Sequence, residues 1–176
     1  MSDIFTSTMD TKVGPFSTVV DADGAVLAAG WTGDLAELLG LIHPDLRGEP
    51  RARHDLGAAT EAVRAYHDGD IDAPDAITVR QHSGGTFLTA GWQALRKVAP
   101  GEAITYTELA TRTGNPRANR AAAQACARNA AALFVPCHRI IRADGGLGGF
   151  RWGVDIKRWL LAHESAAAQI PAQPLR

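Results

Sequence analysis

Cys137 and His138 stand side by side within LFVPCHRII, which spans residues 133–141. A cysteine reacts as a thiolate, so it needs a neighbour that removes its proton or stabilises its negative charge. His138 is a candidate for this base. Side chains of adjacent residues diverge by about 100° in a helix and about 180° in a strand, so a direct contact is awkward. A bridging water would let the proton pass between them.

The imidazole of His138 also needs a partner that fixes its tautomer and stabilises its protonated form. We predict that Glu164 has this role. It closes the segment DIKRWLLAHE (155–164), for which we predict a helix with Asp155 as its N-cap. A glutamate at a helix end is also a common solvated surface residue, and the sequence leaves that alternative open.

Between these groups lies DGGLGGFRWG (144–153), with five glycines in ten positions. Glycines let a backbone come close to a ligand and present its N–H groups. Phe150 and Trp152 could form the wall of a flat apolar pocket. They could equally be loop residues held against the core.

Two capped helices joined by a short turn are predicted within TYTELATRTGNPRANRAAAQACARN (105–129). Thr105 and Glu108 form a capping box, and Gly114 is a C-terminal stop. Asn115-Pro116 would serve as N-cap and first-turn proline of the second helix. This arrangement is typical of a helix-turn-helix.

The second of these helices has one polar and one small-residue face. Spacings of i, i+3, i+7 and i+11 place Arg117, Arg120, Gln124 and Arg128 together, while the opposite face carries Ala118, Ala121, Ala122, Ala125 and Cys126. Such a slim, basic helix can approach a nucleic-acid duplex closely. A solvated helix face would look similar.

The first half of the chain is predicted to be a small α+β unit. The expected elements are two strands within 16–31 around an Asp23-Gly24 turn, helices over 34–41 and 57–67, and a short strand over 73–80. HSGG (82–85) is the candidate linker. After it, the spacing of apolar residues predicts a helix that ends at Pro100-Gly101.

Charge is distributed unevenly along the chain, although its formal net charge is only −1. Residues 1–85 hold six Lys and Arg against fourteen Asp and Glu, whereas residues 86–176 hold twelve against five. This asymmetry indicates that a polyanionic partner would meet the second half. Two solvated surfaces of opposite sign would give the same count.

The cysteine count and the hydropathy pattern indicate the compartment. Two cysteines cannot form a disulfide framework, and no CxxC pair or histidine-rich cluster offers ligands for a structural zinc, so we expect no metal. No run of about 18 apolar residues and no signal-peptide pattern is present. We therefore predict a cytoplasmic protein that does not span a membrane.

Five segments of the second half resemble the O6-alkylguanine-DNA alkyltransferases, also called methylated-DNA-protein-cysteine methyltransferases. They are TYTELA, GNPRANRAAAQACARN, LFVPCHRII, GGFRWG and KRWLLAHE, in family order, and VGPFSTVVDADGAVLAAGW resembles the family more loosely. The resemblance implies an α+β fold. Its parts would be a ribonuclease-H-like N-terminal α/β domain (1–82) and a mainly helical C-terminal domain (83–176) with a winged-helix-like helix-turn-helix.

The resemblance also implies a function and a set of site residues. The protein would rotate O6-alkylguanine out of duplex DNA and transfer the alkyl group irreversibly to Cys137, once per molecule and without a cofactor, with O4-alkylthymine as a further substrate class. The implied catalytic residues are Cys137, His138, Glu164, Tyr106 and Asn129. Those implied to contact DNA are Arg120, which would enter the base stack, with Arg117, Ala121, Gln124 and Arg128. The implied pocket comprises Val135, Pro136, Gly149, Phe150, Arg151 and Trp152.

The partner implied in this way is double-stranded DNA containing alkylated guanine, bound by a monomer that could act cooperatively. One departure from the family pattern is Phe150, where many members have tyrosine. Arg151 and Trp152 resemble the bacterial adaptive-response forms. The absence of their cysteine-rich N-terminal domain suggests that metal-dependent phosphotriester repair and transcriptional activation are not implied.

Two other functions fit some of the same residues. Cys126 and Cys137, eleven positions apart, could oxidise together in a DNA-binding redox sensor. An isolated cysteine is usually a small buried hydrophobe, however, and Cys126 lies among alanines. A cysteine hydrolase would need direct pairing of Cys137 with His138, which their adjacency disfavours.

Overall fold

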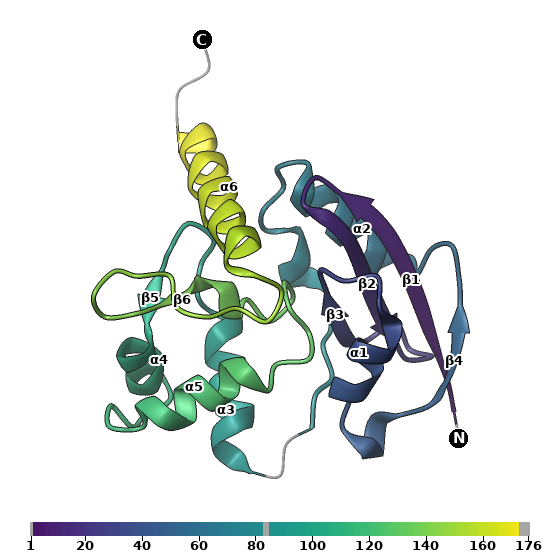
Figure 1. Cartoon of the computed structure of the whole chain (residues 1–176), viewed down its shortest axis with the longest axis horizontal. Coiled ribbons are helices and arrows are strands. Elements are labelled where there is room, and N and C mark those ends of the chain that lie inside the picture. Colours follow the sequence, from purple (N-terminus) through teal and green to yellow (C-terminus); the bar gives the residue numbers. More distant parts are fainter. Residues whose placement is uncertain (1, 83–84, 173–176) are drawn as a thin grey trace.

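The computed structural model describes the backbone of residues 2–82 and 85–172, with side chains up to residue 168. A four-stranded sheet occupies one side of the molecule and a group of helices the other (Figure 1). The predicted mixture of helices and a small sheet is confirmed. Residues 83 and 84 of the predicted linker lie outside the described residues.

The sheet has the strand order β3-β2-β1-β4, in which β4 runs parallel to β1 and the other neighbours are antiparallel. Its strands are β1 (Asp3–Thr11), β2 (Gly14–Val20), β3 (Val26–Gly30) and β4 (Glu49–Ala52). The hairpin predicted around Asp23-Gly24 is confirmed, since it joins β2 to β3 and Gly24 has a φ of +84°. Sequence analysis missed β1 and β4; β4 lies in the loop that contains Pro50 and Arg51 and is exposed at the sheet edge.

The two predicted helices of the first half are confirmed as α1 (Leu35–Leu41) and α2 (Ala58–His67). The strand predicted over 73–80 is wrong. Ala73–Ala76 forms a 3-10 turn with Pro74 in its first positions, and only Val79 makes a single bridge, to Val26 of β3. Proline has no N–H to donate to a sheet ladder, which limits pairing to the end of this segment.

The second half contains α3 (Thr86–Arg96), α4 (Tyr106–Arg112) and α5 (Asn119–Ala127), which pack against one another at the lower left of Figure 1. The Thr105 hydroxyl accepts a hydrogen bond from Glu108 N at 3.1 Å, and Gly114 has a φ of +96° after α4. The predicted N-cap of α4 and the stop after it are therefore confirmed. A short parallel pair, β5 (Ile104–Thr105) and β6 (Ile140–Ile141), lies beside them.

Two predicted helix starts are wrong. Asn115 Oδ1 accepts from Arg117 N at 3.1 Å, which makes a local turn, so α5 begins only at Asn119. Arg117 consequently precedes α5. The last helix, α6 (Val154–Ala172), begins before Asp155, which lies in its first turn and is not its N-cap. Because α6 continues to Ala172, Glu164 lies in its middle rather than at its end.

One buried hydrophobic cluster includes side chains from the sheet, α2, α3 and α6. The segment after α5 also joins the sheet edge: Ala29 N donates to Ala130 O at 2.8 Å and Ala132 N donates to Ala29 O at 3.0 Å. These contacts place the stretch that leads to Cys137 directly against β3. The first half thus supports the backbone on which the reactive residues lie.

Candidate active site

Cys137 begins a 3-10 helix, η3 (Cys137–Arg139), at the end of a tightly held turn. Leu133 has a φ of 75° and is buried, a left-handed conformation that is rare for a leucine. Val135 N donates to Ala131 O at 2.8 Å, and Cys137 N donates to Val135 O at 2.8 Å. These contacts hold the backbone firmly at Cys137.

Asn129 connects this turn to the end of α5. Its Nδ2 donates to Val135 O at 2.7 Å, and its Oδ1 accepts from Ala131 N at 3.0 Å. Gln81 Nε2 donates to the same Oδ1 at 3.0 Å, while its Oε1 accepts from Ala130 N. Sequence analysis pointed to Asn129 but missed Gln81, because nothing in the local spacing marks a contact across 48 positions.

His138 and Glu164 form a buried pair, with Nε2 and Oε2 separated by 2.7 Å and both side chains 0% exposed. Arg139 holds the carboxylate from a second direction, through Nε to Oε1 and one Nη to Oε2, both at 2.9 Å. The structure thus brings His138 and Glu164 together as predicted. The open alternative, a solvated Glu164, is excluded by its burial.

Tyr66 of α2 also contacts this carboxylate, although sequence analysis did not foresee it. Its hydroxyl donates to Glu164 Oε2 at 2.7 Å, and the tyrosine is fully buried. Burial raises the pKa of Tyr66, and the charge of Glu164 raises it further. The hydroxyl therefore stays protonated and acts as a donor.

Burial and pairing together set the protonation states of the centre. Burial alone would raise the pKa of Glu164, but His138 and Arg139 outweigh it and hold that pKa well below its ordinary range. Burial lowers the pKa of His138, an effect that Glu164 opposes only in part. An ionised carboxylate can only accept, so Nε2 of a neutral His138 carries the proton and Nδ1 carries the lone pair. Nδ1 is buried and has no hydrogen-bond partner among residues 2–82 and 85–172.

Lys157 is a buried cation close to the reactive sulfur. Its Nζ donates to Ile140 O at 2.6 Å and to Gly149 O at 3.3 Å. Burial raises the pKa of the Cys137 thiol, and Asn129 and the Lys157 cation oppose this increase. The cysteine is consequently a neutral thiol at rest, with groups in place that favour its anion.

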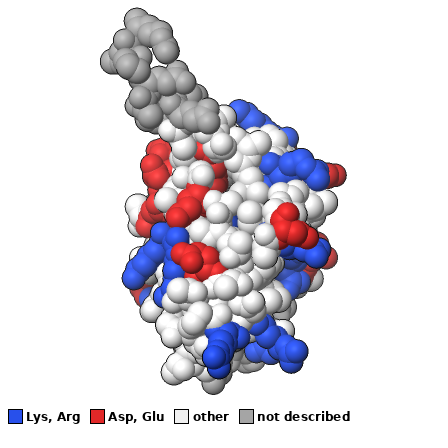
Figure 2. Space-filling model, turned by 90° about the vertical axis from the view of Figure 1, so that its left-hand side faces the viewer, with Lys and Arg blue, Asp and Glu red and all other residues white. Residues whose placement is uncertain are grey.

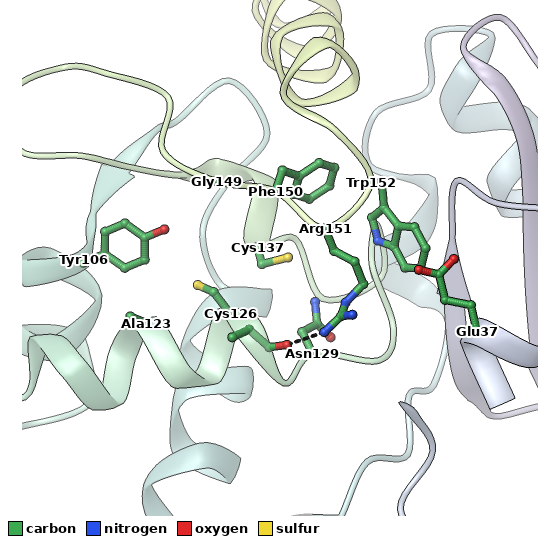
Figure 3. A pocket seen from close by; sticks show the side chains of 11 residues that line it. Glu37, Tyr106, Ala123, Cys126, Asn129, Cys137, Gly149, Phe150, Arg151 and Trp152 are labelled. Carbon is green, nitrogen blue, oxygen red and sulfur yellow. Dashed lines mark hydrogen bonds between the residues drawn. The ribbon is translucent and has the colours of Figure 1, made fainter. Parts of the chain in front are cut away.

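Cys137 lies at the wall of a cavity of about 500 Å³ (Figure 3). Tyr106 and Ala123 lie on one side of the two sulfur atoms and Phe150, Arg151 and Trp152 on the other. The cavity is lined by Glu37, Tyr106, Ala123, Cys126, Ala127, Asn129, Cys137, Gly149, Phe150, Arg151 and Trp152. A volume of this size admits a flat heterocycle with a small substituent.

Most of the predicted pocket residues line this cavity, and two do not. Val135 and Pro136 are buried behind the turn and are absent from the cavity wall formed by the described residues. Glu37, from α1, and Cys126 also line it, which sequence analysis did not predict. Cys126 packs against the hydrophobic core and also lines the cavity, and burial raises the pKa of its thiol.

The glycine-rich segment closes the cavity on the side of the sheet. The indole of Trp152 lies so close to Gly30 of β3 that a Cβ at Gly30 would stand 2.3 Å from it. Phe150 packs against Trp31, with ring centroids 6.0 Å apart. Arg151 donates to Ala127 O at 2.9 Å and so joins this segment to the end of α5 (Figure 3). Both aromatic residues therefore form cavity walls and also pack on the core.

The polar face predicted for the second helix is only partly formed. Arg120 and Gln124 are exposed on α5, but Arg117 lies in the preceding turn and Arg128 at the C-cap. Ala121 is partly buried. Arg120 also lines a second cavity of about 460 Å³ together with Tyr106 and Arg142. Tyr106 lines both cavities, so Arg120 lies in the cavity next to that of Cys137.

Basic side chains do not form one continuous surface on this side of the molecule. Figure 2 shows several separate groups of Lys and Arg with Asp and Glu between them, and some of the basic groups lie at the lower end, at the height of α3 and α5 in Figure 1. On this face, a polyanion would therefore contact local basic groups rather than a uniform patch.

This chain is similar in sequence and in fold to known proteins. A family model described as the DNA-binding domain of 6-O-methylguanine DNA methyltransferase matches residues 86–166. A methylated-DNA–protein-cysteine methyltransferase of Salmonella typhimurium (strain LT2) is 35% identical over 158 residues, which cover 88% of this chain and 91% of the relative. The chain belongs to the methylated-DNA–protein-cysteine methyltransferase family.

The chain is also similar to a longer relative and to a solved structure. The bifunctional transcriptional activator and DNA repair enzyme Ada of Escherichia coli K12 is 49% identical over 105 residues. This match covers 60% of the chain but only 29% of Ada. A crystal structure of Mycobacterium tuberculosis OGT in complex with DNA matches with a TM-score of 0.73 at 26% identity, over 93% of this chain and 94% of that chain.

One further polar group lies outside the cavity at Cys137. Asp45 Oδ2 stands 3.7 Å from His43 Nδ1 and 3.9 Å from His82 Nδ1, a set of ligand types that a metal ion accepts. Sequence analysis did not predict this group. Its members lie at or near the surface, and the contacts among them account for the arrangement.

Among the described residues, no helix is long and apolar enough to cross a membrane.

Proposed function

We propose that this protein repairs alkylated DNA by transferring the alkyl group from O6 of guanine to the sulfur of Cys137. The observation that carries the proposal is the position of Cys137, which lies at the wall of a cavity for a flat heterocycle and next to the buried His138–Glu164 pair. Family membership supports the same reaction, since curated relatives are named methylated-DNA–protein-cysteine methyltransferases.

The transfer is a displacement at carbon. The thiol proton of Cys137 passes through a water molecule to Nδ1 of His138, and the resulting imidazolium is stabilised by Glu164. The sulfur then forms a bond to the alkyl carbon while the bond from that carbon to O6 breaks. The electron pair leaves with guanine, where a proton from the Tyr106 hydroxyl neutralises it. Tyr106 lines the cavity, and burial raises its pKa, so it holds its proton until guanine leaves.

The product of this reaction is a thioether, so each chain reacts once. The displacement itself needs no cofactor. An S-alkylcysteine is not reversed by ordinary reductants, and a displacement by a thiolate requires no metal. The protein is therefore consumed stoichiometrically. O4-alkylthymine, which carries its alkyl group on a similar exocyclic oxygen, is a second substrate class within this proposal.

Access to O6 requires rotation of the nucleotide out of the duplex, at a cost of a few kcal/mol. Arg120 is exposed on α5, lines a cavity together with Tyr106 and would replace the lost stacking. Small side chains near it, such as Ala121, would let α5 enter a narrow groove. Arg117, Gln124 and Arg128 would contact the DNA backbone. The DNA bound to the M. tuberculosis relative supports DNA as the partner.

The proposal assigns different tasks to the two parts of the chain. Residues 1–82, with a ribonuclease-H-like topology, would support the centre, and residues 83–176, with a winged-helix-like motif, would bind DNA and accept the alkyl group. The protein would act as a cytoplasmic monomer. The alternatives of a redox sensor using Cys126 and Cys137, or of a cysteine hydrolase, find no support among the named relatives.

The test is to incubate the protein with a duplex that contains O6-methylguanine labelled in its methyl group. We expect the label on the protein to reach one methyl group per chain and then stop. Cys137→Ala should accept none, whereas Cys126→Ala should still accept one. Continued turnover, or label on the Cys137→Ala variant, would refute the proposal.

A further inference from the structure

Tyr66 approaches the centre from α2, in the half of the chain that carries none of the predicted site residues. Its hydroxyl donates to Glu164 Oε2 at 2.7 Å, and its ring is 0% exposed. Its position is fixed by edge contacts with His67 and His163, at centroid distances of 5.3 and 5.2 Å. His163 Nε2 also lies 2.7 Å from Tyr66 O. The hydroxyl therefore points at the carboxylate without freedom to turn away.

With Tyr66 in place, Oε2 of Glu164 accepts from three donors. Oε1 accepts from Arg139, and Oε2 accepts from Arg139, His138 and Tyr66. Each oxygen of an ionised carboxylate offers about two lone-pair sites, so the three donors on Oε2 compete for two sites, while Oε1 accepts from Arg139. The negative charge is shared among all four donors, and His138 faces only a part of it.

This sharing affects the protonation state of His138. A carboxylate with no other donor favours the imidazolium form strongly. An imidazolium has no lone pair on Nδ1 and cannot accept the proton of Cys137. Each additional donor on Oε2 weakens the pull on the His138 proton and so favours the neutral ring.

We infer that Tyr66 is a positioning residue that keeps His138 neutral, with Nδ1 ready to accept a proton. Its consequence for alkyl transfer rests on the proposed function, whereas its effect on His138 does not. Tyr66→Phe removes the hydroxyl and keeps the ring packing. The other titratable or charged groups around the pair stay in place, namely His67, Asp75, Arg139, Lys157 and His163.

The direct test is an NMR titration of isotope-labelled histidines in the whole protein without DNA. The His138 signal is identified by its absence from His138→Asn. In Tyr66→Phe we expect the midpoint of the His138 titration to move to higher pH by about one unit, a tenfold change in the protonation equilibrium. An unchanged midpoint in a folded variant would overturn the inference.

Two further proteins keep the test decisive. Thr18→Val removes another buried hydroxyl, one without a hydrogen-bond partner among the described residues, and should leave the His138 midpoint where it is. If Tyr66→Phe does not fold, fluorotyrosine can replace Tyr66 in a Tyr106→Phe background. The hydroxyl at position 66 is then a stronger hydrogen-bond donor to Glu164. The His138 midpoint should then move to lower pH, and a fixed midpoint would again refute the inference.

A kinetic measurement distinguishes an effect of Tyr66 on His138 from a general structural role. If the proposed function holds, Tyr66→Phe should slow methyl transfer mainly on the acidic side of the pH–rate profile, where its His138 is already protonated. An equal loss at every pH would indicate a structural role and contradict the inference. If the wild-type protein transfers no methyl group, the proposed function fails, while the titration still decides the role of Tyr66.

Discussion

The imidazole of His138 and the carboxylate of Glu164 lie 2.7 Å apart, and neither side chain reaches solvent. A hydrogen bond between a neutral donor and a charged acceptor is stronger in such surroundings than in water. The pair therefore fixes both the orientation of the ring and the nitrogen that carries the proton. The reactivity of Cys137 should depend on it.

Glu164→Gln tests this dependence. The amide keeps the shape of the side chain but loses the charge that stabilises the imidazolium, so methyl transfer should slow by roughly 100-fold. Arg139 would lose its buried partner, and the free energy of unfolding should fall by about 3 kcal/mol. Single-turnover rates and denaturant unfolding measure the two effects. A folded variant with the wild-type rate would mean that another group orients His138.

Lys157→Met tests whether the Lys157 cation stabilises the thiolate of Cys137. The Lys157 cation lowers the pKa of Cys137 against the effect of burial, so its removal should raise that pKa. Because the thiolate is the reactive form, the rate of alkylation by iodoacetamide rises with pH through this pKa, and the whole curve should move to higher pH. Arg158→Met, which removes an exposed cation one position away, should leave the curve in place. No displacement in the Lys157 variant would exclude the proposed effect.

Arg120→Ala tests the role of α5 in base rotation. Loss of the side chain should weaken the reaction with duplex DNA about tenfold or more, but it should barely change the slow reaction with free O6-methylguanine base. Arg158→Ala, at an exposed position of α6, is the matched control. Rates with the two substrates are compared under the same salt concentration, because contacts with phosphates depend on salt. Equal losses with both would remove the argument for Arg120.

Local patterns in the sequence predicted much of the fold. The Asp23-Gly24 turn marked the β2–β3 hairpin, and Thr105 with Gly114 marked both ends of α4. Errors arose where two local signals competed. Asn115 caps a turn instead of a helix, and Asp155 follows the true start of α6. Helix boundaries depend on such small differences in free energy.

The contact between His138 and Glu164 could be predicted from the sequence, because the chemistry expected of Cys137 restricts the residue types around it. Tyr66, Gln81 and Lys157 could not, since each acts through a contact with a distant part of the chain. A tyrosine on an amphipathic helix or a lysine in a helix near a glycine-rich loop is unremarkable by spacing. Their importance becomes visible only once folding brings them to Glu164, Asn129 and Ile140.

The most direct test of the central claim is peptide mass mapping after reaction with a duplex that contains a single O6-methylguanine. We expect the mass of one added methylene on the peptide that contains Cys137, none on the peptide that contains Cys126, and an equal amount of guanine restored in the DNA. Restored guanine without a modified Cys137, or a methyl group on Cys126 alone, would contradict the account.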